Sequence, residues 1–360
     1  MNQSIKSTIA IVSVILFLVL VYFLNTIVVY IIISAILALI GRPLMKLLTK
    51  VKIRNRQLPI SFRSFLTLIV LLLFFASFFR LFAPLVIQEA KIISSIDYSE
   101  FSIGLNEPIT DLQVWLKNNH LLSKDSSLEN EILGVFNLTK VSNLLNSLIG
   151  FLGNGLISIF SIVFITFFFL KEKNIFENII ESLTPEKRKE QIGSAIQNTK
   201  KLLTRYFIGV IFQILIITII VSTGLSLLDI ENAFLIGFLA GIINVIPYVG
   251  PLIGALFGVV LGITTNLDLD FYTQLIPLSF KIISVFAIMQ MIDNFIIQPI
   301  IFSNSVKAHP LEIFIIILSA GTIWGVTGML VAIPFYTVLR VIAKEFLSDF
   351  KIVQILTKDI

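Results

Sequence analysis

Long apolar blocks constrain this chain more than any other feature of its sequence. Three of them fill most of the C-terminal half, at residues 233–264, 271–302 and 311–342. About twenty helical apolar residues are needed to cross ~30 Å of hydrocarbon. Overall, 56% of the residues are hydrophobic and 14% are charged, whereas soluble domains are about half apolar and a quarter charged. We therefore predict an all-α polytopic membrane protein, since a β-barrel would show alternating hydrophobicity.

The charges between the apolar blocks predict which side of the membrane each loop faces. Residues 41–63 carry seven basic residues and no acidic one. Because cytoplasmic loops are rich in Lys and Arg, we expect this loop and both termini to be cytoplasmic. The less apolar residues 83–147 then form an external region of amphipathic helices.

Shorter apolar segments precede the three large blocks. Residues 9–23 and 27–40 predict a helical hairpin, and three further spans are expected at residues 64–82, 148–170 and 206–228. Between the last two, Thr184-Pro185-Glu186 is typical of a helix start, with threonine as the cap. We expect the helix that follows to be amphipathic and to lie on the cytoplasmic side.

The block at residues 233–264 contains a break. It includes Asn244-Val-Ile-Pro247-Tyr248-Val-Gly250-Pro251, and each proline removes a helical hydrogen bond. Gly250 can adopt backbone angles that other residues avoid. Unpaired peptide groups cost several kcal/mol in hydrocarbon, so a break there must be covered by protein or line a watery cavity. Such a break indicates a binding or gating site.

Two topologies satisfy the predicted cytoplasmic C-terminus. All three large blocks can cross once, giving eight spans. Alternatively, residues 233–264 and 311–342 are re-entrant hairpins that enter from opposite sides, which leaves six full spans, as in inverted-repeat transporters. We favour the hairpins, because the third block is interrupted by Gly321, Gly325 and Gly328. The alternative is that these glycines only allow close helix packing.

A polar stripe runs along the second half of the block at residues 271–302. Gln290, Asn294 and Gln298 recur at every fourth position and share one helix face, with Asp293 beside them. An ionisable residue within a membrane segment is a functional hypothesis by default, although Asp293 could also sit at the membrane interface as a packing or capping group. His309-Pro310 opens the next block, where the histidine can titrate or can simply start a helix.

Several classes of chemistry are excluded by what the sequence lacks. It has no cysteine, no Gly-Lys-Ser/Thr phosphate loop and no His-Glu-x-x-His motif. No second intramembrane aspartate is available to form a protease dyad with Asp293. We therefore expect no enzyme activity, catalytic residue, metal site, cofactor or nucleic-acid partner.

The motifs together resemble one known family. Ile246-Pro-Tyr-Val-Gly-Pro251 is similar to the Ile-Pro-Tyr-x-Gly-Pro signature of the autoinducer-2 exporter family of bacterial membrane proteins. Further similarities follow the family's order, at Tyr206, Gly209, Gln213, Asp293-Asn294, Gln298-Pro299, His309-Pro310, Gly321, Gly325, Gly328 and Pro334. The chain departs from the pattern at Ala320-Gly321, where the family has two glycines, and at residues 303–308, which lack the usual glycine.

The resemblance implies a fold, a location and an activity. It implies a homo-oligomer, a pentamer, in the bacterial inner membrane, whose protomers act as elevator-type carriers with two hairpins holding the substrate. Some relatives export the quorum-sensing signal autoinducer-2, and others resemble Na⁺(Li⁺)/H⁺ antiporters. The apolar segments and loop charges divide the chain into membrane segments (1–82), an external region (83–147), a fourth span with a cytoplasmic helix (148–205), a transport core (206–345) and a cytoplasmic tail (346–360).

We expect a secondary transporter for a small polar molecule such as autoinducer-2. The candidate substrate-binding residues are Asn244, Pro247, Tyr248, Gly250, Pro251, Gly254, Gly321, Gly325 and Gly328. The candidate residues for the path or for coupling to H⁺ or Na⁺ are Gln290, Asp293, Asn294, Gln298 and His309. The alternatives are a Na⁺(Li⁺)/H⁺ antiporter and, from a different class, a non-transporting membrane scaffold that acts through its external region or cytoplasmic helix.

Overall fold

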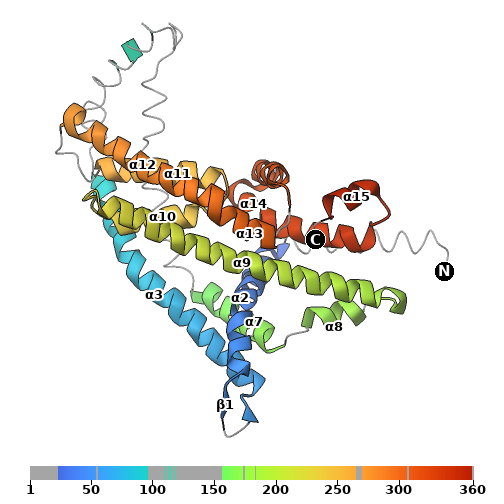
Figure 1. Cartoon of the computed structure of the whole chain (residues 1–360). Helices are drawn as coiled ribbons and strands as arrows, with labels where there is room; N and C mark the ends of the chain where they lie inside the picture. The colour runs from blue at the N-terminus through green and yellow to red at the C-terminus, as the bar shows by residue number, and fades with distance from the viewer. Residues whose placement is uncertain are drawn as a thin grey trace. The chain divides into compact units, whose positions relative to one another are not determined.

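The structure is a computed structural model of the chain (Figure 1). It describes residues 23–53, 56–95, 110, 113–114, 117, 156–172, 175–182, 184–264, 270–305 and 308–358. The predicted first helix, at residues 9–23, and most of the predicted external region lie outside the described residues.

The described residues are almost entirely helical, and five helical segments are long and apolar enough to cross a membrane. They are Asn25–Thr49, Ile60–Leu85, Lys189–Ser226, Thr273–Ile301 and Pro310–Phe346, the last of which is interrupted at Trp324 and Gly325. Their length and composition confirm the prediction of a polytopic α-helical membrane protein. A short antiparallel pair, β1 (Lys52–Ile53) and β2 (Arg56–Gln57), lies in the basic loop.

The contacts divide the chain into two compact units. The first comprises Met1–Phe75, Gly155–Ile211 and Pro299–Ile360, and the second comprises Ala76–Asn154 and Phe212–Gln298. The helices α3 (Ile60–Ser95) and α9 (Lys189–Ser226) each contribute residues to both units.

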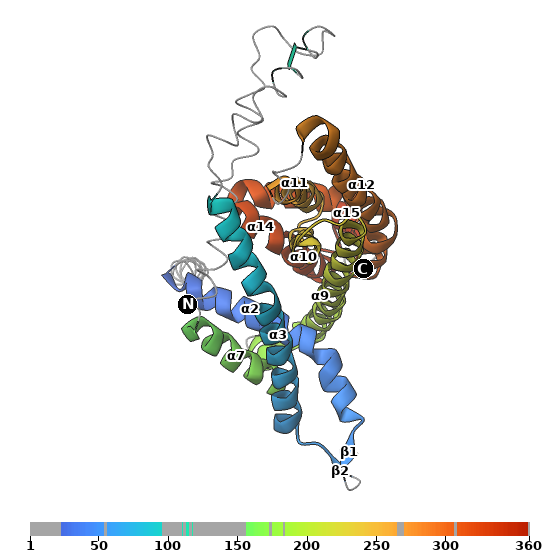
Figure 2. The same cartoon turned by 90° about the vertical axis from the view of Figure 1, so that its left-hand side faces the viewer.

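In the first unit, α2 (Asn25–Thr49) packs along α7 (Leu156–Lys171), as Figures 1 and 2 show. Two polar contacts join these apolar helices. Tyr30 Oη and Ser158 Oγ are 2.6 Å apart, and Ser34 Oγ donates to the Ile162 carbonyl at 3.0 Å. Ser34 is fully buried, so its hydroxyl needs this partner in an apolar interface.

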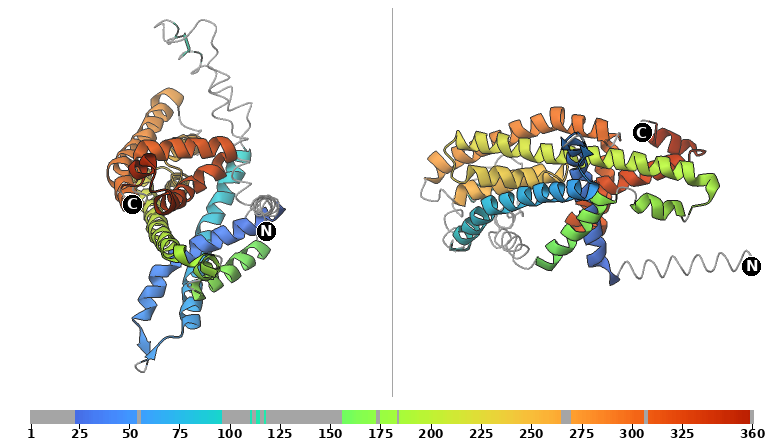
Figure 3. Two further views of the ribbon diagram at one scale, coloured as in Figure 1. Left: turned by 90° about the vertical axis from the view of Figure 1, so that its right-hand side faces the viewer. Right: turned by 90° about the horizontal axis from the view of Figure 1, so that it is seen from below.

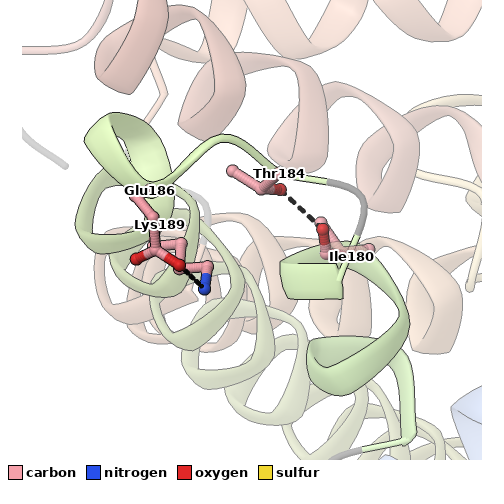
Figure 4. A network of polar contacts seen from close by, with 4 residues as sticks. All are labelled: Ile180, Thr184, Glu186 and Lys189. Atoms are coloured by element: carbon pink, nitrogen blue, oxygen red, sulfur yellow. Dashed lines mark hydrogen bonds and ion pairs between the residues drawn. The ribbon is translucent and has the colours of Figure 1, made fainter.

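The helix start predicted at Thr184 is wrong in detail. The Thr184 hydroxyl donates back to the Ile180 carbonyl in the last turn of α8 (Ile175–Ser182), and Pro185 precedes the short helix η1 (Glu186–Arg188) without a side-chain cap (Figure 4). From Lys189, α9 then runs without interruption to Ser226 (Figure 3). The predicted cytoplasmic helix and fifth span are therefore one helix, because no proline or turn sequence separates them.

The last long helix, α14 (Pro310–Phe346), folds back on itself within the first unit. Its helical backbone is interrupted at Trp324 and at Gly325, which has φ 60° and ψ −144°. Beyond this turn, Tyr336 Oη donates to Glu312 Oε2 at 2.8 Å. Arg340 donates to the Leu356 carbonyl, which ties α15 (Lys351–Leu356) to α14. The two arms of α14 are therefore antiparallel.

In the second unit, α10 (Ala233–Ile243) and α11 (Val249–Thr264) form an antiparallel helical hairpin (Figure 2). A Cβ on Gly250 would face Ile243 and one on Gly254 would face Ala240, whereas one on Gly258 would meet the Phe286 ring first and then Ile236. The arms have 11 and 16 residues, about 16 and 24 Å at 1.5 Å per residue. Both blocks thus contain two helical arms joined by a turn, while their being re-entrant hairpins that enter from opposite membrane faces stays a prediction.

A continuous apolar core holds the second unit together. It combines buried side chains of α3, α9, α10, α11 and α12 (Ile276–Ile292), among them Phe82, Ile217, Leu235, Leu261 and Ile282. The Phe82 ring stacks on Phe238, with ring centroids 3.4 Å apart. This core fixes the ends of α10 and α12, where the polar residues of the unit lie.

Candidate functional site

A π-helical turn shapes the polar end of α12. The segment η3 (Asp293–Ile297) separates α12 from α13 (Gln298–Ser305), and the backbone N–H of Gln298 bonds to the Asp293 carbonyl five residues earlier. In a regular α-helix residue 298 would lie about 140° around the axis from residue 293. The wider turn instead places Gln298 Nε2 2.7 Å from Asp293 Oδ2. π-turns of this kind are frequent at functional sites.

The sequence accounts for the position of this wide turn. Pro299 has no N–H, and its ring would clash with the carbonyl of Phe295 in a continuous α-helix. The π-turn covers Phe295 and so falls directly before the proline.

Asp293 is the centre of the site. Its side chain is fully buried, and both carboxylate oxygens accept hydrogen bonds from side-chain amides. Gln213 Nε2 donates to Oδ1 at 2.9 Å, and Asn244 Nδ2 donates to Oδ2 at 3.0 Å, in addition to Gln298. Three N–H donors are therefore directed at one carboxyl group, whose oxygens serve as the acceptors. These four residues all belong to the second unit. We call them the Asp293 cluster.

Glycines bring the helices that carry this cluster close together. A Cβ on Gly237 would lie 2.3 Å from Ser222 Oγ, and one on Gly241 would lie 2.7 Å from the Ile214 carbonyl oxygen. Small residues at such positions let helix backbones approach in membranes. Gly237, Gly241 and Asn244 share one face of α10, so this close approach to α9 presents Asn244 beside Gln213.

The predicted polar stripe is present next to the cluster. Asn294 Oδ1 accepts from Gln290 Nε2 at 2.8 Å and from Gln298 Nε2 at 3.3 Å. Asn294 itself is exposed, whereas Asp293 and Gln298 are buried. Gln298 therefore links the exposed amides of the stripe to the buried carboxylate.

Two carbonyl oxygens in this region have no hydrogen-bond partner among the described residues. They are Asn244 Oδ1 and Gln290 Oε1, and both are buried. Leaving such an oxygen unpaired costs about 1–3 kcal/mol. Carboxylate and amide oxygens are ligands for hard cations, and the same oxygens accept hydrogen bonds from hydroxyl groups. The cluster and the neighbouring Gln290 therefore carry oxygen atoms of the kind that cations and hydroxyl groups bind.

The tip of the α10–α11 hairpin adjoins the cluster through Asn244, the residue at which α10 ends. Tyr248 adopts a left-handed backbone, with φ 68°, and Pro247 and Pro251 are buried. The predicted role of Gly250 needs correction, because its φ is not positive. A Cβ there would lie 2.2 Å from the Ile243 carbonyl oxygen, so glycine is required for close approach. Gly254 packs against Ala240 in the same way, less tightly.

The remaining predicted residues lie in the first unit. Gly325 forms the turn of α14, and a Cβ on Gly328 would lie 2.1 Å from the Ala320 carbonyl oxygen. A Cβ on Gly321 would meet only the flexible end of Met329. His309 begins α14, and its Nδ1 accepts the Leu311 N–H at 3.3 Å. The helix-start role of His309 is thus present, and its role in transport stays a prediction.

Gln213 is the cluster member that sequence reasoning did not assign to the site. It was singled out only as part of the family-like Tyr206, Gly209, Gln213 pattern. A buried glutamine within an apolar helix is itself a signal, because its amide must find a partner inside the protein. Gln213 lies 80 positions before Asp293, and nothing in a single sequence pairs the two.

Comparison with known proteins agrees with this architecture. Residues 11–348 match the model of the family described as AI-2E family transporter. The chain belongs to the AI-2E transporter family. It is 25% identical over 327 residues to "Putative transport protein YueF" of Bacillus subtilis, covering 88% of this chain and 84% of the relative. It is 34% identical over 59 residues to "Putative permease PerM" of Escherichia coli, covering 16% and 17% of the two chains. The protein is therefore an integral membrane protein of a transporter family.

Proposed function

We propose that this protein is a secondary transporter that moves a small polar molecule, such as autoinducer-2, across the bacterial inner membrane. The observation that carries the proposal is the Asp293 cluster. It is a fully buried carboxylate within an apolar helix, held by amides from three separate segments. Burying a charge in this way is costly, and membrane proteins retain such residues where ions or substrates pass.

The cluster suits reversible binding because amides hold the carboxylate and no Lys or Arg bonds to it among the described residues. A hydrogen bond to a charged group contributes about 1.5–3 kcal/mol. A substrate hydroxyl or a cation can therefore replace an amide donor without breaking a buried ion pair. Asn244 links this exchange to the tip of the α10–α11 hairpin, since it donates to Asp293 and directly follows the last residue of α10.

The transport movement that we propose is of the elevator type. The α10–α11 hairpin packs without space for a Cβ at Gly250, so it moves as one body. We propose that the two hairpins enter the membrane from opposite faces and that the working form is a homo-oligomer, a pentamer, with both termini cytoplasmic. The family resemblance and the charge distribution of the loops support these assignments.

Flux through reconstituted protein tests the proposal. Proteoliposomes containing the purified chain are expected to exchange autoinducer-2, and Asp293→Asn is expected to lower the flux more than tenfold. Asp229→Asn is the matched control, because Asp229 is exposed in the same unit and its left-handed backbone, with φ 55°, also suits asparagine. Full flux in the Asp293 variant would contradict the assigned site, and no flux of any solute or ion would favour a scaffold.

A Na⁺(Li⁺)/H⁺ antiporter is the second candidate function. Two amide oxygens without a hydrogen-bond partner among the described residues, Asn244 Oδ1 and Gln290 Oε1, favour the antiporter. Together with the Asp293 carboxylate they are oxygen ligands of the kind that a hard cation takes. This candidate predicts that a Na⁺ gradient drives proton movement in the same proteoliposomes and that Asp293→Asn abolishes it. Autoinducer-2 flux that persists in that variant while proton movement stops would select the antiporter.

A further inference from the structure

A cavity of about 670 Å³ lies within the first unit, between α2, α7, α8 and α9. It is separate from the Asp293 cluster, all of whose members belong to the second unit. Figure 1 shows α8 alongside α9, and the ion pair between Glu177 and Lys200 joins these two helices. The charged residues that line the cavity are Arg42, Lys46, Glu177, Lys200, Lys201 and Arg205.

The charge of this cavity is strongly positive. Among its described lining residues, five side chains are basic and one, Glu177, is a carboxylate. The side chains of Glu177 and Lys200 are only 16% and 19% exposed. One carboxylate cannot neutralise five cations, so the lining keeps an excess of four positive charges. Like charges held this close repel one another, and a bound anion would relieve that repulsion.

The cavity also has an apolar wall. Met45 and Leu170 are buried and pack together with Ala38 and Phe169 on α2 and α7. The polar residues Thr49 and Thr204 also line the cavity. Cationic and apolar surfaces in one cavity match an anionic head group attached to a hydrocarbon chain.

We propose that this cavity is a binding site for a phosphate-bearing anion, of the kind found in the head group of an anionic phospholipid. Arg42 and Lys46 belong to the basic region that the loop charges assign to the cytoplasmic side, where anionic lipid head groups attract basic segments. Basic pockets between membrane helices on that side are suited to such head groups. The ligand bridges α2 to α9 through their basic side chains, and Glu177 weakens its binding. This proposal does not depend on the proposed transport function.

Binding of defined probes to the purified full-length chain tests the site. The probes are dioctanoyl phosphatidylglycerol, dioctanoyl phosphatidylcholine and inorganic phosphate, each titrated in detergent and followed by microscale thermophoresis. The phosphatidylglycerol is expected to bind the native chain, and Arg42→Gln/Lys201→Gln is expected to bind about 25-fold more weakly, at about fivefold for each basic residue removed. Glu177→Gln is expected to bind several-fold more tightly, which a misfolded variant would not do.

Lys189→Gln is the matched control. Lys189 is 41% exposed in the same helix α9, outside the cavity, and pairs with Glu186 (Figure 4). The dissociation constant of the Lys189→Gln variant for phosphatidylglycerol is expected to stay within twofold of the native value. If inorganic phosphate also binds, and its affinity falls in the same way when Arg42 and Lys201 are replaced, the site is supported and its ligand is a soluble anion and not a lipid. Equal binding of phosphatidylcholine, or equal affinity in the native chain and the double variant, would overturn the proposal.

Discussion

Asp293 imposes demands on residues that are far from it in the sequence. A buried carboxylate needs donors for both oxygens, and three amides from α9, the end of α10 and α13 supply them. Each of those amides is in turn buried, with exposed fractions of 5% for Gln213, 1% for Asn244 and 6% for Gln298. Among the described residues, Gln213 is the one side chain that donates to Oδ1, whereas Oδ2 has two donors. Removing Gln213 therefore leaves a buried carboxylate oxygen without a partner.

The hydrogen bond from Gln213 to Asp293 Oδ1 gives a prediction for Gln213→Leu. This change removes the donor to Asp293 Oδ1 and is expected to lower the free energy of unfolding by about 1–3 kcal/mol. Thermal unfolding of the purified protein in detergent measures the effect. Gln191→Leu, at an exposed position of the same helix, serves as the control and is expected to stay within about 0.5 kcal/mol. Equal stability of the two variants would show that Gln213 does not support Asp293.

How far residues can be predicted from the sequence depends on the distance over which they interact. The stripe of Gln290, Asn294 and Gln298 follows from helical periodicity, and the structure joins all three through the Asn294 side chain. The bond from Gln298 to Asp293 does not follow, because it depends on a π-turn that periodicity does not reveal. Gln213 and Asn244 join the cluster through tertiary packing, which a single sequence does not determine.

At the scale of elements, the two hairpins are closed by glycines in different ways. In the α10–α11 hairpin, Gly250 is needed because the Ile243 carbonyl approaches to 2.2 Å of where a Cβ would stand. In α14, Gly325 is needed because its backbone has φ 60° and ψ −144°, a region restricted in practice to glycine. The sequence marks both breaks equally well, and only the backbone conformation distinguishes close approach from a special turn.

The packing of the α10–α11 hairpin predicts that alanine lowers stability at Gly250 more than at Gly254, on the same face of α11. Gly250→Ala must force the arms apart and is expected to destabilise the protein by about 1–3 kcal/mol. Its flux in proteoliposomes should fall as well. Gly254→Ala is the matched control one turn further along α11, where a Cβ would meet Ala240 at an ordinary 3.6 Å. A loss in the Gly254 variant as large as in the Gly250 variant would contradict the packing explanation.

The turn of α14 predicts a contrast between two of its glycines. Gly325→Ala is expected to cost about 1–3 kcal/mol of backbone strain, although open space surrounds that position. Gly321→Ala is expected to be tolerated, because only the flexible end of the Met329 side chain must move. Thermal unfolding of both variants measures the difference, and an unaffected Gly325 variant would mean that the turn is not fixed by glycine.

Boundaries of elements were less predictable than their existence. The separate helix and span expected at residues 185–228 are one 38-residue helix, α9, because its amphipathic first half and apolar second half share an unbroken helical sequence. Helix α3 similarly continues to Ser95, beyond the apolar segment that ends at residue 82. Hydropathy reports where hydrocarbon surrounds a helix, and it does not report where hydrogen bonding along that helix stops.

At the scale of the whole molecule, the number of membrane crossings decides between the two topologies left by the sequence. If residues 233–264 form a re-entrant hairpin, the chain returns to the outside before α12 and Asp270 is external. If that block crosses once, Asp270 is cytoplasmic. The same choice places Ala308, just before α14, on the cytoplasmic side for hairpins and outside for single crossings. Two positions therefore distinguish the topologies with opposite results.

Cysteine accessibility measures this difference directly, because the chain has no cysteine of its own. A membrane-impermeant thiol reagent applied to intact spheroplasts is expected to label Asp270→Cys and to leave Ala308→Cys unlabelled until the membrane is permeabilised. Glu231→Cys and Lys50→Cys serve as the external and cytoplasmic references, since both topologies place them alike. Both Glu231 and Lys50 are exposed in the structure, so their thiols remain reachable. Labelling of Ala308→Cys with protection of Asp270→Cys would establish eight single crossings and exclude opposed re-entrant hairpins.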